Sequence, residues 1–270
     1  QTEPVITLTG SNSVIVSVGD TYSDQGATAT DNVDGDVTSS IQLTGSVDTN
    51  SVGIYTLTYN VSDAAGNAAT PVTRSVSVQD ADAPVVSAPA NIIVAATNAS
   101  GTNSTDSAIS AFLTGASAND NVDGVITSIS HDAPSVFPLG VTSVTFSALD
   151  VAGNSGSAQS TVTIADQSVP VISLIGDSAM TLSIGEVFAD SGTTATDNVD
   201  GDLSGSVQVS GSVDINSVGS YTLTYSVSDA AGNAALSVSR HVTITDDIDE
   251  DGLPDAYEEA NGLDKNDPSD

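Results

Sequence analysis

The stretch that decides the fold is Tyr55–Asn67, which reads YTLTYNVSDAAGN and recurs almost unchanged as YTLTYSVSDAAGN at Tyr221–Asn233. Its first half alternates large apolar side chains with Thr, a pattern typical of a strand that buries one face. It ends in the sequence DAAGN at Asp63–Asn67, and Asp, Gly and Asn are residues that favour turns. The stretch therefore predicts a half-buried strand that runs into an acidic turn.

A second phrase repeats at the same spacing. Asp31–Asp36 reads DNVDGD and recurs as Asp197–Asp202, so residues 4–80 and 170–246 are two copies of one fold without gaps between their motifs. A more distant copy between them contains DNVDG at Asp120–Gly124 and DVAGN at Asp150–Asn154. We therefore predict modules at 1–81, 82–166 and 167–246, joined by linkers of a few residues, and a tail at 247–270.

The modules are predicted to be all-β. Val, Ile, Thr and Ser dominate, and β-branched residues suit a pleated, half-buried surface. In the first module we expect strands near 4–9, 13–18, 26–30, 38–46, 48–50, 53–62 and 69–79. Many short strands with polar turns in about 80 residues indicate an immunoglobulin-like sandwich. The predicted fold is three such sandwiches in an extended rod with a short calcium-loop tail, and no long helical pattern appears before the tail.

Charge excludes several kinds of partner. The chain has 35 acidic and 3 basic residues and a formal net charge of −32, so it would repel nucleic acid and anionic membranes. It contains no cysteine and no apolar run long enough for a membrane span, so we expect neither disulfides nor membrane insertion. A divalent cation would neutralise this charge, and the alternative is an acidic surface suited to salty water.

The repeated phrases carry a family resemblance. Modules one and three, with ATDNVDGD and YTLTY, resemble bacterial immunoglobulin-like surface repeats, and module two, with NDNVDG and FPLGVTSVTFSALDVAGN, resembles a hyalin repeat. Such repeats occur in adhesins and as accessory modules of secreted enzymes. The resemblance implies an extracellular location, secreted or at the cell surface. Because the sequence starts abruptly at Gln1 and stops at Asp270 within a motif, we expect it to be a fragment of a larger protein.

Two acidic turns per module are the candidate metal sites. We expect the DNVDGD turn to follow the second strand and the DAAGN turn to follow the sixth. Both turns would then lie at the N-terminal end of the module, beside the preceding linker. Crowded carboxylates repel one another without a cation, and Ca²⁺ binds six to eight such oxygens. The alternative is that these residues only form turns. The predicted calcium ligands are Asp31, Asn32, Asp34, Asp63 and Asn67, with Glu3 as a further candidate; Asp80, Asp82, Asp120, Asn121, Asp123, Asp150 and Asn154; and Asp166, Asp197, Asn198, Asp200, Asp229 and Asn233.

The tail carries a denser motif. Asp247, Asp249, Asp251, Leu253, Asp255 and Glu258 occupy positions 1, 3, 5, 7, 9 and 12 of an EF-hand-like calcium loop, and Gly252 occupies the turn position. Pro254 can begin only a short exit helix, which should end near Asn261-Gly262. The segment resembles a thrombospondin type 3 or dockerin-like calcium repeat, and the residues after Asp264 resemble a second, truncated repeat.

Function is predicted as structural and not enzymatic. His131, Asp132 and Ser135 lack the glycines of a nucleophile elbow, so a hydrolytic triad is not supported. By analogy with cadherins, calcium at the module junctions would stiffen an extracellular spacer of a surface or adhesin-type protein. The alternative is an accessory region of a secreted hydrolase, and an independent lectin or protein-binding module is a third class. Glycan or protein partners would be bound by other domains of the parent protein.

Overall fold

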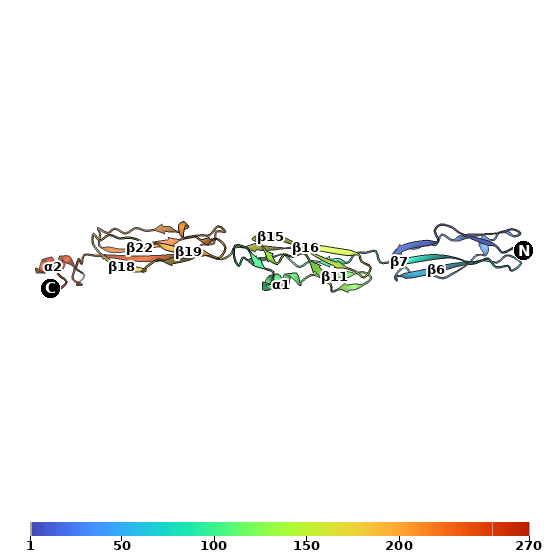
Figure 1. Cartoon of the computed structure of the whole chain (residues 1–270), viewed down its shortest axis with the longest axis horizontal. Coiled ribbons are helices and arrows are strands. Elements are labelled where there is room, and N and C mark those ends of the chain that lie inside the picture. Colours follow the sequence, from blue (N-terminus) through green and yellow to red (C-terminus); the bar gives the residue numbers. More distant parts are fainter. Residues whose placement is uncertain (1, 250, 270) are drawn as a thin grey trace. The chain divides into compact units, whose positions relative to one another are not determined.

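The computed structural model describes residues 2–249 and 251–269 and contains three β-sandwich modules (Figure 1). By contacts the chain divides into two compact units, and the division passes through the middle module. The first unit comprises Gln1–Pro89, Leu113–Asp132 and Val144–Ser160; the second comprises Ala90–Phe112, Ala133–Ser143 and Thr161–Asp270. The predicted module boundaries remain predictions.

The first module is a sandwich of two sheets. One sheet has the order β1-β3-β4 and the other β2-β7-β6-β5. The strands are β1 (Val5–Leu8), β2 (Ser13–Ser17), β3 (Ala27–Asp31), β4 (Gly35–Asp36), β5 (Gln42–Thr44), β6 (Gly53–Asn60) and β7 (Val72–Gln79). Between the sheets lie Ile6, Ala29, Leu57, Tyr59, Val61 and Ala69.

Two expectations about these strands need correction. Residues 38–46 form a short 3-10 helix, Thr38–Ser40, before β5, and residues 48–50 form a turn in which Asp48 Oδ1 accepts the Asn50 N–H at 3.0 Å. The DNVDGD turn also follows the third strand in sequence and not the second. The physical reason is that the first strand changes sheets: β1 pairs with β3, and β2 pairs in parallel with β7.

The third module repeats this topology within the second unit. Its sheets have the orders β17-β19-β20 and β18-β23-β22-β21, and β18 pairs in parallel with β23. Its core consists of Ile172, Ala195, Leu223, Tyr225 and Val227. The strands are β17 (Val171–Leu174), β18 (Ala179–Ser183), β19 (Thr193–Asp197), β20 (Gly201–Asp202), β21 (Gln208–Ser210), β22 (Gly219–Ser226) and β23 (Val238–Thr245), with a 3-10 helix at Ser204–Ser206.

The middle module has the same kinds of pairing. In the first unit β11 (Ser117–Asp120) pairs with β8 (Val85–Ser87) and β12 (Gly124–Ile126), and β13 (Ile129–His131) pairs with β15 (Gly140–Leu149). In the second unit β16 (Ser155–Ala165) pairs in parallel with β9 (Ile92–Ala95), and β10 (Thr102–Asn103) pairs with β14 (Val136–Phe137). His131 is exposed at the end of its strand, as predicted.

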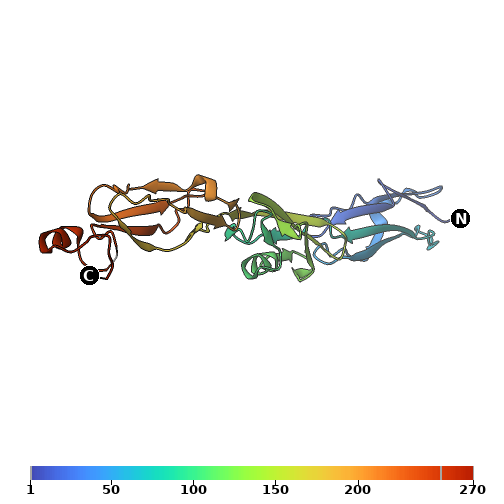
Figure 2. The same cartoon turned by 60° about the vertical axis from the view of Figure 1, so that its left-hand side comes forward.

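One short helix lies before the tail, where the sequence shows no long helical pattern. α1, Ser107–Leu113, is visible as a coil in Figures 1 and 2. Asp106 caps it, since its Oδ1 accepts the Ala108 N–H at 2.9 Å, and Ile109 and Phe112 bury one face. A helix of seven residues with two buried side chains is too short to show helical periodicity in the sequence. In the described residues, neither helix is both long and apolar enough to cross a bilayer.

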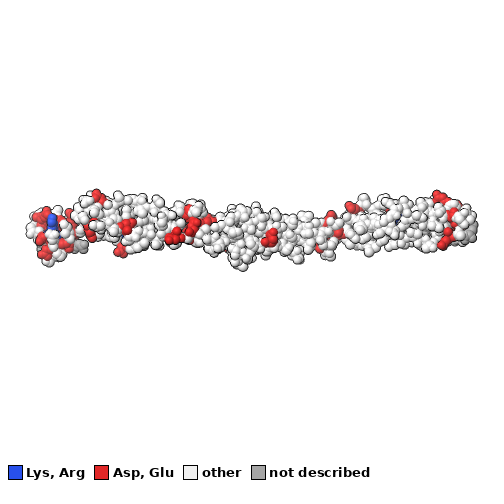
Figure 3. All heavy atoms as spheres, turned by 45° about the horizontal axis from the view of Figure 1, so that its top comes forward, with Lys and Arg blue, Asp and Glu red and all other residues white. Residues whose placement is uncertain are grey.

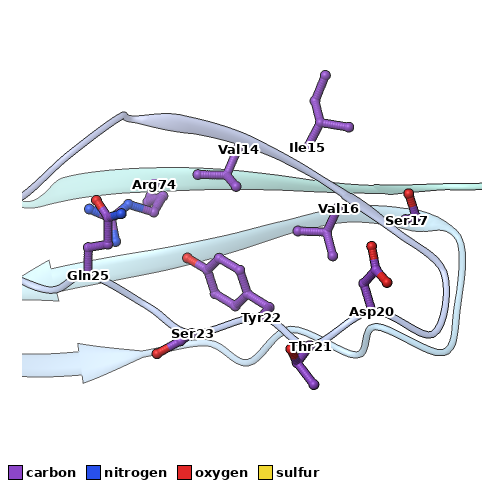
Figure 4. A pocket seen from close by; sticks show the side chains of 10 residues that line it. All are labelled: Val14, Ile15, Val16, Ser17, Asp20, Thr21, Tyr22, Ser23, Gln25 and Arg74. Atoms are coloured by element: carbon purple, nitrogen blue, oxygen red, sulfur yellow. The ribbon is translucent and has the colours of Figure 1, made fainter.

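Two of the three basic residues are buried inside the outer modules. Arg74 is 1% exposed, pairs with Asp24 and donates through Nε to Ser11 O at 3.0 Å; it lies beside a cleft of about 530 Å³ whose walls include Tyr22 and Gln25 (Figure 4). Arg240 occupies the corresponding place in module three and is 0% exposed. The surface is therefore almost free of positive charge, and its carboxylates gather in separate patches (Figure 3).

Candidate metal centres at the acidic turns

The first acidic turn, Asp31–Asp36, is held by hydrogen bonds to the side chain of its first residue, Asp31. Asp31 Oδ1 accepts the Val33 N–H at 2.8 Å and the Asp34 N–H at 2.9 Å. Gly35 closes the turn with φ of +75°, a conformation that glycine adopts without strain. Asp31 is only 8% exposed, and its Oδ2 is buried with no hydrogen-bond partner. The local bonds that make the turn thus use one carboxylate oxygen and leave the other unpaired.

The second acidic turn is locked by its own asparagine. Asp63 accepts the Asn67 backbone N–H at 2.7 Å and the Asn67 side-chain amide at 2.6 Å. The two turns are joined directly, because Asp34 Oδ2 accepts the Ala64 N–H at 3.0 Å. Turns about thirty residues apart in sequence therefore form one acidic surface at one end of the module, as the sequence predicted.

Modules two and three reproduce these bonds atom for atom. Asp120 and Asp197 each accept two backbone N–H groups of their turns, and Asp150 and Asp229 each accept both N–H groups of the asparagine four residues later. The bridge between turns is also kept, with Val151 N–H donating to Asp123 and Ala230 N–H donating to Asp200, both at 2.7 Å. This geometry explains why the two phrases repeat together.

Linker carboxylates complete two of the three surfaces. Asp80 lies with Asp120 and Asp150, and Asp166 lies with Asp197, Asp200 and Asp229; in each group one oxygen per residue lies within 4.8 Å of every other. The linkers are held by the same asparagines, since Asn154 Nδ2 donates to Asp80 O and Asn233 Nδ2 to Asp166 O, both at 3.3 Å. In the first module the corresponding group is Asp31, Asp34 and Asp63.

Unpaired buried oxygens point to a cation in these groups. The Oδ2 atoms of the linker aspartates and of the leading turn aspartates are buried without a hydrogen-bond partner; they belong to Asp31, Asp80, Asp120, Asp166 and Asp197. A buried carboxylate oxygen that lacks a partner is costly, and buried charges are normally paired or bound to a metal. The turns alone do not explain this arrangement, because their hydrogen bonds are already satisfied by the opposite oxygens.

Electrostatics agree with this reading at the linkers. Burial, and then the nearby charges of Asp120, Asp150 and Asp123, raise the pKa of the Asp80 carboxyl above its usual value. Burial and the charges of the corresponding three aspartates likewise raise the pKa of Asp166. At these two linker aspartates the raised pKa marks a carboxylate whose charged form a cation would stabilise.

Several predicted ligands have other partners in the structure. Asp82 Oδ2 accepts the Asn121 amide at 2.7 Å, Asn198 Nδ2 donates to Ala96 O at 3.1 Å and Thr97 O at 3.4 Å, and Glu3 accepts the Thr70 hydroxyl at 3.4 Å. Asp123 is outside the closest first-linker group, and Asn32 has exposed surface. The carbonyls at 96 and 97 could not be found from sequence, because backbone atoms of an irregular loop carry no residue signature.

The tail brings only part of its predicted ligand set together. Asp247, Asp249 and Asp251 form a group with oxygens within 4.8 Å, and burial, followed by the charges of Asp251 and Asp247, raises the pKa of Asp249. Glu258 lies in α2, Asp255–Asn261, and is 0% exposed. Asp255 Oδ1 instead accepts the Ile248 N–H at 2.9 Å.

The tail's local structure follows its sequence. α2 begins after Pro254 and ends at a left-handed Gly262, where the sequence placed the exit helix. Ser183 Oγ donates to Asp247 O at 2.7 Å, so the loop is anchored on β18 of module three. Leu253, whose carbonyl is the predicted ligand at loop position 7, donates its N–H to Asp251 at 2.7 Å.

Comparison with protein families identifies the modules. The description "Bacterial surface protein, Ig-like domain" matches residues 6–78 and 172–244, together more than half of the chain, and an HYR domain matches residues 79–164. The chain belongs to the bacterial surface protein Ig-like domain family. Neither match identifies a catalytic domain, and the first suggests the cell surface. No curated protein matches.

Several solved structures match this chain at low identity and with TM-scores below 0.5. The CBM51-2 and INT domains of Clostridium perfringens ZmpB share 23% identity, cover 33% of this chain and 21% of that chain, and give a TM-score of 0.25. A structure of the ZmpB M60 catalytic domain with CBM51-1 and CBM51-2 shares 16%, with 90% and 31% coverage and a TM-score of 0.25. Mouse cadherin-23 EC22-24 shares 13%, with 89% and 98% coverage and a TM-score of 0.35. This chain thus spans less than a third of either ZmpB structure.

Proposed function

We propose that this chain is a calcium-stiffened spacer of a bacterial surface or adhesin-type protein. The observation that carries the proposal is that carboxylate oxygens of a linker lie close to carboxylate oxygens of the next module, and that these oxygens are buried without a hydrogen-bond donor. Asp80 Oδ2 belongs to the first linker and Asp120 Oδ2 to module two; Asp166 Oδ2 and Asp197 Oδ2 have the same relation at the second linker. A cation bound by both would cross-link linker and module.

Calcium suits these groups better than other common ions. The donors are carboxylate oxygens, with backbone and amide carbonyls nearby, and histidine and cysteine take no part. Such an all-oxygen set suits Ca²⁺ or Mg²⁺, and several carboxylates in one group fit Ca²⁺, which takes six to eight oxygen ligands, better than Mg²⁺, which usually keeps several waters. The tail loop, which resembles thrombospondin type 3 or dockerin-like repeats, would take a further Ca²⁺ through its three aspartates and Glu258.

The mechanical role follows from electrostatics. Without a cation, each linker carboxylate faces like charges of the next module and is repelled. With a cation, the same carboxylates share one positive centre, so the linker is held against the module. Stability rises with occupancy as well, by about 2.7 kcal/mol when free calcium exceeds Kd a hundredfold. A region that holds its length in calcium would keep distal domains away from the cell.

Small-angle scattering of the full chain tests this role. We expect a narrow distance distribution in calcium and a broader one in chelator. A variant with Asp120→Asn and Asp197→Asn should remain broad at calcium concentrations that order the parent chain, whereas Asp177→Asn, at an exposed position outside the clusters, should respond like the parent. Superimposable curves in calcium and chelator would exclude a calcium-stiffened spacer.

A further inference from the structure

The two junctions differ in what remains when a cation is removed. Their linkers have the same length, since Asp80 and Asp166 each precede the first proline of the next module by four residues. Each linker aspartate also faces the same three carboxylates: Asp120, Asp150 and Asp123 at the first junction, and Asp197, Asp229 and Asp200 at the second. The carboxylates that face the two linker aspartates therefore correspond, and the first linker carries one more carboxylate, Asp82, where the second has Ser168.

The difference lies in one asparagine of the DNVDG turn. At the second junction Asn198 Nδ2 reaches back to module two and donates to Ala96 O at 3.1 Å and Thr97 O at 3.4 Å. At the first junction the corresponding Asn121 Nδ2 donates to Asp82 Oδ2 at 2.7 Å, within the linker that leads into its own module. The Asn198 bonds at the second junction therefore join module three to module two, whereas the Asn121 bond at the first junction does not reach module one.

The preceding modules explain the difference. In module two the loop after β9 is folded back on itself, with Thr97 N–H donating to Gly101 O at 3.2 Å and Thr97 Oγ1 to the same carbonyl at 2.7 Å, and the carbonyls at 96 and 97 accept Asn198. In module one the corresponding residues form a tight turn around Gly19, which is closed by Asp20 N–H donating to Ser17 O at 3.1 Å. That turn and the loop are built differently, although the strands before them correspond.

The first junction also encloses open space. Val52 and Gln79 of module one and Val122 and Val151 of module two line a cleft of about 410 Å³ beside Asp80. Val151 is 90% exposed and Val52 is 56% exposed, so these apolar groups face solvent and do not pack closely. Such a cleft offers little resistance to bending.

We propose that the first junction is a calcium-dependent hinge, whereas the second junction stays closed without calcium through Asn198. This inference rests on the proposed function, because it assigns the calcium response to one of the two junctions. Two neutral hydrogen bonds, one of them long, favour the closed second junction by about tenfold in chelator. Falling calcium would therefore release the first junction at residues 80–82 and leave the second junction closed.

Spin-label distance measurements on the full chain can observe each junction separately, because the chain has no cysteine of its own. Ile15→Cys with Ser157→Cys spans the first junction, and Ile93→Cys with Ser237→Cys spans the second at corresponding positions. Ile15 and Ile93 are 70% and 68% exposed, and both serines are exposed. In calcium both pairs should give narrow distributions; in chelator the first should widen and the second should not.

Asn198→Leu is the decisive variant, since it removes both donors without adding charge. In chelator it should widen the second pair to the width of the first, whereas Asn216→Leu, at an exposed position in the turn after Asp214, should leave both pairs unchanged. Equal widening of both pairs in the parent chain, or no effect of Asn198→Leu, overturns the hinge and leaves the proposed function standing. Narrow distributions for both pairs in chelator overturn the hinge and the proposed function together.

Discussion

Replacing Asp24 by Ala should be among the most destabilising single changes in module one. Asp24 accepts the Tyr59 hydroxyl at 2.7 Å, the Tyr22 hydroxyl at 3.1 Å and the Gly26 N–H at 3.1 Å, and it pairs with the buried Arg74 guanidinium. Removing one partner of a buried ion pair costs about 3–5 kcal/mol. Arg74 would keep backbone acceptors at Ser11 and Gly26, so we expect a loss of about 3 kcal/mol.

The repeat supplies an internal control. Asp190 accepts the Tyr225 hydroxyl at 2.7 Å and the Gly192 N–H at 3.1 Å, but Arg240 Nε lies 3.4 Å away, and Phe188 stands where module one has Tyr22. With two hydrogen-bond partners fewer, Asp190→Ala should cost about 2 kcal/mol less than Asp24→Ala.

Hydrogen exchange with mass spectrometry can measure both losses, because peptides from β7 and β23 report on their own modules. The experiment should use the full chain in calcium, so that the metal sites remain the same in every variant. Asp24→Asn, which keeps an acceptor but loses the charge, should fall between the parent and Asp24→Ala. A loss below about 1 kcal/mol for Asp24→Ala, or a larger loss for Asp190→Ala, would refute the reasoning about a buried ion pair.

Three further outcomes are expected. Phe188→Tyr should stabilise module three by about 1 kcal/mol through a new hydroxyl bond to Asp190, measured by the same exchange experiment; a loss of stability would contradict it. Burial and the Asp24 carboxylate raise the pKa of Tyr59 to about 12, so its contribution is complete below about pH 10 and is lost as pH rises towards 12; Tyr59→Phe should flatten this alkaline loss in melting curves, and an unchanged slope counts against it. Glu258→Ala should weaken calcium binding at the tail in calorimetry, whereas Glu259→Ala, at an exposed position paired with Lys265, should not; equal affinities for both would remove Glu258 from the site.

Much of the fold could be predicted from the sequence because its signals are local and repeated. Alternation in Tyr55–Tyr59 and its copy at Tyr221–Tyr225 marks strands that do form, and the turn residues of DNVDGD and DAAGN end them. What could not be predicted depends on contacts between distant residues. β1 and β2 belong to different sheets because of their partners, and α1 is buried through Ile109 and Phe112, although its own sequence is short and only weakly helical.

The candidate site divides in the same way. The grouping of the turn carboxylates could be predicted because Asp recurs at fixed positions in two turns, and the sandwich topology places those turns together. The sequence could not predict which oxygen of each carboxylate is hydrogen-bonded and which is unpaired. That depends on the backbone N–H groups that Asp31 and its counterparts Asp120 and Asp197 accept in the folded turn. Asp82 was expected among the ligands but is paired with Asn121, because a linker side chain two residues beyond Asp80 can turn towards its own module.

The central claim is that the junction clusters bind calcium, and anomalous diffraction from crystals of the full chain grown in calcium tests it most directly. The account predicts one anomalous peak among Asp80, Asp120 and Asp150 and another among Asp166, Asp197, Asp200 and Asp229, in addition to a peak in the tail loop. Peaks confined to the tail, with only water between the junction carboxylates, would contradict it.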